Sequence, residues 1–397
     1  MENKIKEYLN NVLREIDKYK KDFIETSTYI WNNPELGYKE YKASSALIEL
    51  LRSNGFEIQT NVAGLDTAFV ASKKGKKDGP TIGLMSEYDA LEGLDHACGH
   101  NLFSVSAVAT AIGLAKVIDE IGGTIKVIGT PAEEGTVKNA GGKAILVEKG
   151  IFDDVDIAMI CHAEGRTIIE RKLGAATVLE ASFVGKAAHA GGSPEKGINA
   201  LTAGILTINN INGVRQHFLP STIINPIITS GGIGQNTIPD RCEMKMSVRA
   251  STRELLNDVI DLVTRCVEAG AYVTGCTFTV NLPNKIYEDL RPNHELALAF
   301  KEALELLKVE YIQSEDANYA WDAGNVSHLC PTIAPYIKIG SSDLVGHTEE
   351  FKNASCSEEG FEGMMIGAKA MAITSLKYLL DKGLRDNIKL IQEKMLN

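Results

Sequence analysis

The stretch TIGLMSEYDALEGLDHACGHNLFSVSAVATAIGLAKVI, residues 81–118, contains the pattern that decides the fold. Its first part, Thr81–Met85, is a short apolar run typical of a buried strand, and Ser104–Ile118 is a run of small and apolar residues typical of a helix packed closely on a sheet. The same alternation continues with strands over 124–128 and 156–161 and a helix over 144–149. Strands that alternate with helices predict an α/β sheet covered on both faces.

A different order of elements begins at residue 178. Strands are expected over 178–184, 222–229, 241–250 and 277–282, and helices over 198–211 and 252–269, the second helix opened by a Ser251/Thr252 cap. This βαββαβ order makes a complete ferredoxin-like α+β unit. The α/β rhythm resumes with a helix from His294, a strand over 332–339 and a helix over 358–381, and an amphipathic helix over 5–23 opens the chain. We therefore expect an α/β domain in two parts, residues 1–177 and 289–397, that carries an inserted domain, residues 178–288.

The composition is that of a folded protein and argues against several classes of function. The 397 residues carry a net charge of −11, so neither nucleic acid nor an anionic membrane surface is expected as a partner. Runs of about 18 apolar residues, as a membrane-spanning helix requires, do not occur. The seven cysteines are scattered without a CxxC pair, and their odd number favours reduced thiols and a cytoplasmic location.

Potential metal ligands follow successive strands at the points where the strands end. Cys98 and His100 lie two residues apart in the loop after the first strand, although a buried structural cysteine beside a capping histidine would give the same pattern. Glu133 and Glu134 follow the next strand in a loop framed by Pro131 and Gly135, and adjacent side chains in an extended segment point apart, so that one can bind a metal while the other acts as a general base. The loop residues His162 and His347 complete the set. Ligands gather at the carboxyl ends of strands in such sheets, so these coincidences predict a metal site.

Seven motifs, in order along nearly the whole chain, resemble metallopeptidase family twenty of clan MH, the aminoacylase and amidohydrolase group. They are NPELGYKE (33–40), EYDAL (87–91), HACGHN (96–101), PAEEG (131–135), GKAAHAGG (185–192), NTIPD (236–240) and GHTEEF (346–351). HACGHN together with DAGNVSHLCP (322–331) is most similar to aminoacylase-like dipeptidases and p-aminobenzoyl-glutamate hydrolase, whereas more usual members have Asp at the position of Asn101. The resemblance implies a zinc-aminopeptidase-like mixed-sheet catalytic domain with an inserted ferredoxin-like lid and dimerisation domain.

The resemblance also implies roles for individual residues. It implies two divalent metal ions per subunit, most commonly zinc, with Mn, Co or Ni as alternatives, held by Cys98, His100, Glu134, His162 and His347. Glu133 would be the general base, Asp89 would orient a ligand, and Glu87, which stands where the broader family has a ligand histidine, would line the site. In the inserted domain, His189 would stabilise the tetrahedral oxyanion in its own or the partner's site.

Two further residues of the inserted domain are candidates by their chemistry. The amide of Asn236 suits an oxyanion or a substrate carboxylate, and Arg249 could clamp a terminal carboxylate. Each of these residues also has a structural alternative. Asn236 could be a turn residue, Arg249 could form a surface ion pair, and His189 could be a loop histidine with no functional role.

The sequence thus predicts a homodimeric, metal-dependent amidohydrolase or dipeptidase that cleaves the amide of a small substrate. A dipeptide, an N-acyl amino acid and an aminobenzoyl-glutamate type of compound all fit. An aromatic-amine or carbamoyl hydrolase with the same metal site, or a catalytically silent metal- or peptide-binding homologue, remain the alternatives.

Overall fold

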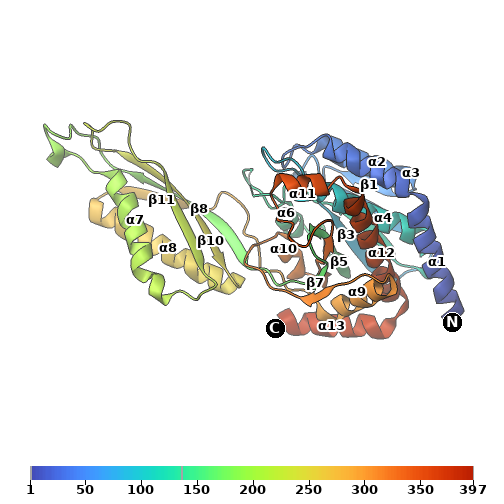
Figure 1. Cartoon of the computed structure of the whole chain (residues 1–397). Coiled ribbons are helices and arrows are strands. Elements are labelled where there is room, and N and C mark those ends of the chain that lie inside the picture. The colour runs from blue at the N-terminus through green and yellow to red at the C-terminus, as the bar shows by residue number, and fades with distance from the viewer. Residues whose placement is uncertain (1, 136, 397) are drawn as a thin grey trace. The chain divides into compact units, whose positions relative to one another are not determined.

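A computed structural model describes residues 2–135 and 137–396 of the chain (Figure 1). Its backbone forms two compact units, each with its own hydrophobic core. The first unit comprises residues 1–172, 290–317 and 322–397, and the second comprises residues 173–289 and 318–321. The short return of Asn318–Trp321 to the second unit had no signal in the sequence.

A six-stranded mixed sheet forms the centre of the first unit. Its strands, in spatial order, are β1 (Glu57–Thr60), β2 (Phe69–Lys74), β4 (Thr124–Gly129), β3 (Thr81–Ser86), β5 (Ile157–Met159) and β13 (Thr332–Ile333). Strands β4, β3, β5 and β13 are parallel, and β1 and β2 are antiparallel additions at one edge. The carboxyl ends of β3 and β4 therefore lie side by side, with Ser86 opposite Gly129.

The helix α4 (His100–Ala115) is buried along nearly its whole length and packs on this sheet. Its small residues permit close approach: a Cβ at Gly113 would lie 2.6 Å from the side chain of Ile16 in α1 (Glu2–Lys18). The long helix α12 (Glu358–Leu380) packs against α4. The remaining helices of this unit are α2 (Lys20–Trp31), α3 (Tyr41–Ser53), α5 (Ile118–Ile121), α6 (Gly142–Glu148), α9 (His294–Leu306), α10 (Ala323–Ser327), α11 (Glu349–Ala354) and α13 (Lys382–Leu396).

Two elements of the first unit differ from the sequence-based expectation. The helix expected over 5–23 is broken at Tyr19 into α1 and α2. The strand expected over 332–339 is divided into β13 and β14 (Tyr336–Lys338), because Pro335, which has no N–H to donate, stands between them. Strand β14 belongs to a second, four-stranded sheet with β12 (Ile312–Ser314), β7 (Ile168–Glu170) and β6 (His162–Glu164).

The second unit is a four-stranded antiparallel sheet with two helices. The chain runs β8 (Ala175–Val184), α7 (Ala200–Val214), β9 (Ile223–Ser230), β10 (Arg241–Ala250), α8 (Arg253–Thr274) and β11 (Thr277–Asn281), and the sheet order is β11-β8-β10-β9. Burial alternates along β8 and β10, so one face of the sheet is covered. The expected Thr252 cap is present, since its side chain accepts a hydrogen bond from the backbone N–H of Leu255. This unit confirms the predicted ferredoxin-like fold.

Within the described residues, every helix is either too short or too polar to cross a lipid bilayer.

Candidate metal centre

The loop between β3 and α4 places Cys98 and His100 on either side of Gly99. Gly99 has φ 78°, and a Cβ there would lie 2.5 Å from the Cβ of Ala163, so only glycine fits without strain. His100 is the first residue of α4, and its side chain is almost completely buried. The turn at Gly99 therefore fixes where the two side chains leave the backbone.

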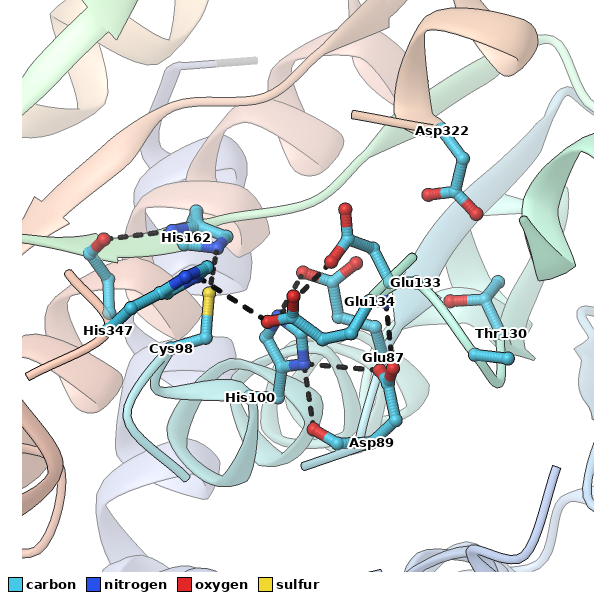
Figure 2. A network of polar contacts seen from close by, with 12 residues as sticks. Glu87, Asp89, Cys98, His100, Thr130, Glu133, Glu134, His162, Asp322 and His347 are labelled. Carbon is cyan, nitrogen blue, oxygen red and sulfur yellow. Dashed lines mark hydrogen bonds and ion pairs between the residues drawn. The ribbon is translucent and has the colours of Figure 1, made fainter. Parts of the chain in front are cut away.

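Asp89 fixes the orientation of the His100 ring. Nδ1 of His100 lies 2.9 Å from the backbone oxygen of Asp89 and 3.2 Å from its Oδ1. Both partners are acceptors, so Nδ1 carries the proton and Nε2 keeps its lone pair for a ligand. That Nε2 atom lies 3.4 Å from Oε1 of Glu87 and 3.9 Å from Oε2 of Glu133 (Figure 2).

The loop after β4 directs two neighbouring glutamates to different partners. The backbone N–H of Glu134 donates to Oδ2 of Asp89 at 2.8 Å, which ties this loop to the preceding one. The Glu134 carboxylate lies 3.7 Å from Nε2 of His347, whereas Glu133 faces His100. Ala132, just before them, has φ 55°, a left-handed conformation that is unusual for alanine.

Cys98, His162 and His347 close the cluster from the other side. Sγ of Cys98 lies 3.4 Å from Nε2 of His162, and the ring of His162 is oriented by its Nδ1, 2.8 Å from the backbone oxygen of Ala163. His347 has φ 62°, and its backbone N–H donates to the oxygen of Ala97. Three overlapping sets have ligand atoms within 4.8 Å of one another: Cys98, His100 and His162; Cys98, Glu134 and His347; and His100, Glu133 and Glu134.

The chemistry of this cluster fits divalent metal ions. Nε2 of His100 and Oε1 of Glu134 are buried without a hydrogen-bond partner among the described residues, although such atoms are costly to leave unsatisfied. Burial lowers the pKa of His162 to about 4, so its imidazole is neutral, as a metal ligand must be. Burial, together with the neighbouring Asp89, raises the pKa of Glu134 to about 7 despite the opposing effect of His100. A bound cation would relieve this crowding of carboxylates.

Lys143 and Asp322 line the cluster and were missed by reasoning from the sequence. Nζ of Lys143 donates to Oε2 of Glu87 at 2.6 Å and to Oδ1 of Asp322 at 2.5 Å, and the backbone N–H of Lys143 donates to the other oxygen of Asp322. The three side chains are at most 1% exposed. Burial opposes ionisation, but Lys143 and His100 hold the pKa of Glu87 at about 2. Asp322 is the first residue of the DAGNVSHLCP motif, but the motif assigned it no role, and Lys143 stands outside all the motifs.

His189 and Asn236 lie together in the second unit, and Arg249 lies apart from them. The backbone N–H of Ala190 donates to the oxygen of Asn236. Nδ1 of His189 accepts the backbone N–H groups of Gly191 and Gly192, so its exposed ring carries the proton on Nε2 and can donate outward. Arg249, near the far end of β10, pairs in register with Ala176, whereas His189 follows Val184 at the opposite end of β8.

Comparisons with known proteins identify relatives of the chain. Residues 171–274 match the family model of a peptidase dimerisation domain. The chain is 33% identical to the Xaa-Arg dipeptidase of Mus musculus, over 94% of this chain and 90% of that protein. It is 29% identical to one of the polypeptides of the p-aminobenzoyl-glutamate hydrolase of Escherichia coli, over 93% and 91% of the two chains.

A solved structure shares the fold. The dinuclear metal-binding peptidase of the M20 family from Bacillus subtilis superimposes with a TM-score of 0.70 at 20% identity, over 91% of this chain and 99% of that one. The mixed sheet, the inserted ferredoxin-like unit and the identity to the mouse enzyme over nine-tenths of both chains lead to one conclusion. The chain belongs to the M20 family of metal-dependent peptidases and amidohydrolases.

Proposed function

We propose that this protein is a dipeptidase that binds two divalent metal ions, most commonly zinc, through Cys98, His100, Glu134, His162 and His347. The observation that carries the proposal is the convergence of these side chains, with the Glu133 carboxylate 3.9 Å from Nε2 of His100. When bound, the ions polarise the scissile carbonyl and acidify the attacking water.

Glu133 acts as the proton carrier of the reaction. Its carboxylate takes a proton from the attacking water and delivers it to the leaving nitrogen. Without a cation, burial and the charge of Glu134 raise the pKa of Glu133; a cation bound by Glu134 would lower that pKa, so that the Glu133 carboxylate is free to accept a proton. Asp89 keeps the His100 ring in the tautomer that presents Nε2.

Two subunits are needed to complete the site in this proposal. Arg249 lies beside Ala176 on β8, and the loop that carries His189 begins just after Val184. Ala176 and Val184 are eight residues apart on this strand, or roughly 27 Å at the usual rise per residue. A dipeptide is much shorter, so His189 and Arg249 of one subunit do not both reach the same substrate. In a homodimer, Nε2 of His189, with Asn236, supplies oxyanion donors to one site, and Arg249 binds the substrate carboxylate in the other. A sedimentation mass equal to one chain at micromolar concentration would contradict the dimer.

A dipeptide with a basic carboxyl-terminal residue is the first substrate to test, because the Xaa-Arg dipeptidase of the mouse is 33% identical. An aminobenzoyl-glutamate type of substrate is the second candidate, since the bacterial hydrolase polypeptide is 29% identical. Both substrates would use the same metal cluster and differ in the group that lies beside the scissile amide. The seven cysteines are all free, in keeping with a reducing compartment such as the cytoplasm.

The test is hydrolysis of a panel of dipeptides, N-acyl amino acids and aminobenzoyl-glutamate, with and without a chelator. Glu133→Gln keeps the size of the side chain but removes the base, so kcat should fall by about 100- to 10,000-fold. Glu57 is an exposed carboxylate at the start of β1, so Glu57→Gln is the matched control and should leave kcat unchanged. A Glu133→Gln enzyme that retains wild-type kcat would show that the base is assigned incorrectly. Release of ammonia without an amino acid would instead favour an aromatic-amine hydrolase, and release of ammonia together with an amino acid from an N-carbamoyl amino acid would favour a carbamoyl hydrolase. Metal binding without any hydrolysis would favour a silent homologue.

A further inference from the structure

The segment Asn33–Glu40, which includes the NPELGYKE motif, has no part in the mechanism above but is firmly attached to the start of α3. Oε2 of Glu35 accepts the backbone N–H groups of Lys42 at 2.8 Å and Ala43 at 3.1 Å. These are donors of the first turn of a helix, which have no partner within the helix itself. The position of the segment relative to α3 is therefore fixed.

The segment also contacts both loops of the metal cluster. The backbone oxygen of Glu35 accepts the N–H of Ala90, one residue after Asp89. The Tyr38 hydroxyl donates to the backbone oxygen of Asn139 at 2.5 Å. Oε1 of Glu40 accepts the backbone N–H of Ala132 at 2.9 Å, one residue before Glu133.

The contact at Ala132 is the most constrained of the three. Ala132 has φ 55°, which L-residues other than glycine adopt only at a cost, so its surroundings must hold it there. Glu40 is fully buried, and its second oxygen accepts the hydroxyl of Thr67 at 2.7 Å. Gly37 also packs closely on Ala132, since a Cβ at Gly37 would come within 2.7 Å of the Cβ of Ala132. The peptide is thus held by a hydrogen bond and by close packing.

We propose that the Asn33–Glu40 segment is a brace for the metal cluster and that Glu40 is its main positioning residue. Glu40 touches neither the substrate nor the ligand atoms. By holding Ala132 in the left-handed region, it sets the directions in which Glu133 and Glu134 leave the backbone. If Ala132 relaxed to a negative φ, the two carboxylates would turn away from His100 and His347 together. The roles of Glu133 and Glu134 rest on the proposed function, but the geometry of the brace does not.

Four variants separate this role from ordinary stabilisation. Glu40→Ala removes the acceptor, and Glu40→Gln keeps an acceptor for the N–H of Ala132 while its amide can donate to the hydroxyl of Thr67. The double variant Glu40→Ala/Ala132→Gly adds a residue that adopts positive φ without a brace. Thr110→Val is the matched control, because it removes a buried hydroxyl of α4 that can donate to the backbone oxygen of Ser106 or of Ala368, about 15 Å along the helix from His100.

Each variant is measured for kcat and KM on the best dipeptide of the panel, for metal retained after dialysis and for its thermal midpoint. Glu40→Ala should lose about 10- to 100-fold in kcat with little change in KM and should retain less metal, because small displacements of catalytic groups have effects of this size. Glu40→Gln should recover most of the loss. Ala132→Gly should raise the kcat and the metal retention of Glu40→Ala, whereas Thr110→Val should lower only the midpoint.

The proposal is overturned if Glu40→Ala matches Thr110→Val in kcat and in metal retention, or if Ala132→Gly fails to improve the Glu40→Ala enzyme. If Glu40→Ala does not fold, Gly37→Ala takes its place, since its Cβ would come within 2.7 Å of the Cβ of Ala132 and displace the same residue, which should lower kcat and metal retention in the same way. If the wild type hydrolyses no member of the panel, the proposed function fails, and metal retention across the same variants still decides whether the brace exists.

Discussion

Substitution of Lys143 by methionine should destabilise the first unit strongly. Nζ of Lys143 lies 2.6 Å from Oε2 of Glu87 and 2.5 Å from Oδ1 of Asp322, and all three side chains are at most 1% exposed. Methionine has a similar length and no branch, so the packing changes little while the positive charge disappears. Two buried carboxylates then lose their shared partner.

The expected loss follows from that arrangement. Removal of one partner from a buried ion pair costs about 3–5 kcal/mol, because the remaining charge is left without compensation. For large domains, each kcal/mol lowers the thermal midpoint by about 2–4 °C, so the midpoint should fall by roughly 6–20 °C. Differential scanning calorimetry of the metal-loaded and the chelator-treated protein measures this shift.

A neutral triad provides the control for the loss of charge. In the triple variant Lys143→Met/Glu87→Gln/Asp322→Asn, the shapes remain similar and none of the three side chains is charged, so most of the lost stability should return. A single Lys143→Met variant that loses less than about 1 kcal/mol would refute the reasoning, because so small a loss is typical of exposed ion pairs. A triple variant no more stable than the single one would show that packing, and not charge, explains the effect.

Three further predictions concern metal removal, Asn101 and the second unit. Chelation should lower the thermal midpoint, since a ligand present at a thousand times its Kd adds about 4 kcal/mol to the stability of the folded state; equal midpoints with and without chelator would contradict a bound metal. Asn101→Asp should cost about 1–3 kcal/mol in urea unfolding, because the Asn101 amide donates to Oγ of Ser27 and to the backbone oxygen of Ser355, and a carboxylate cannot; an unchanged urea midpoint would count against these bonds. Gly204→Ala should cost about 1–3 kcal/mol, because its Cβ would lie 2.7 Å from Sγ of Cys242. Gly213→Ala, on the same helix but with open space around it, should stabilise by about 0.5–1 kcal/mol, and the reverse order of the two variants would refute the packing argument.

The fold could be predicted from the sequence because its local patterns agree with one another. The apolar run at Thr81–Met85 and the small residues after Ser104 indicate a strand and a helix by composition alone. The βαββαβ order of the second unit follows from alternation along each strand and from the cap at Thr252. Each of these signals depends on residues that are close in the sequence.

The metal cluster could also be predicted from the sequence, because its members follow the ends of strands. The carboxyl ends of β3 and β4 are adjacent in the sheet, so the loops that carry His100 and Glu134 had to converge once the strands paired in parallel. The backbone angles that orient these side chains, at Gly99 and Ala132, could not be read from the motifs.

The supporting residues could not be predicted, because their partners are far away in the sequence. Lys143 meets Asp322 across 179 positions, and Glu40 meets Ala132 across 92. A single lysine or glutamate within a mixed segment gives no sign of such a partner. The division between β13 and β14 did have a local signal in Pro335, but only the structure shows that each half joins a different sheet.

Because Asn318–Trp321 belongs to the second unit, the fluorescent tryptophan side chains of the protein are divided between the two units. The chain has two tryptophans: Trp31 lies in α2 of the first unit, where its indole N–H donates to the backbone oxygen of Lys352, and Trp321 lies buried in the second unit. Each unit therefore contains one intrinsic optical probe. In each of the single variants Trp31→Phe and Trp321→Phe, the emission of the one remaining indole reports the melting of one unit, without any attached label.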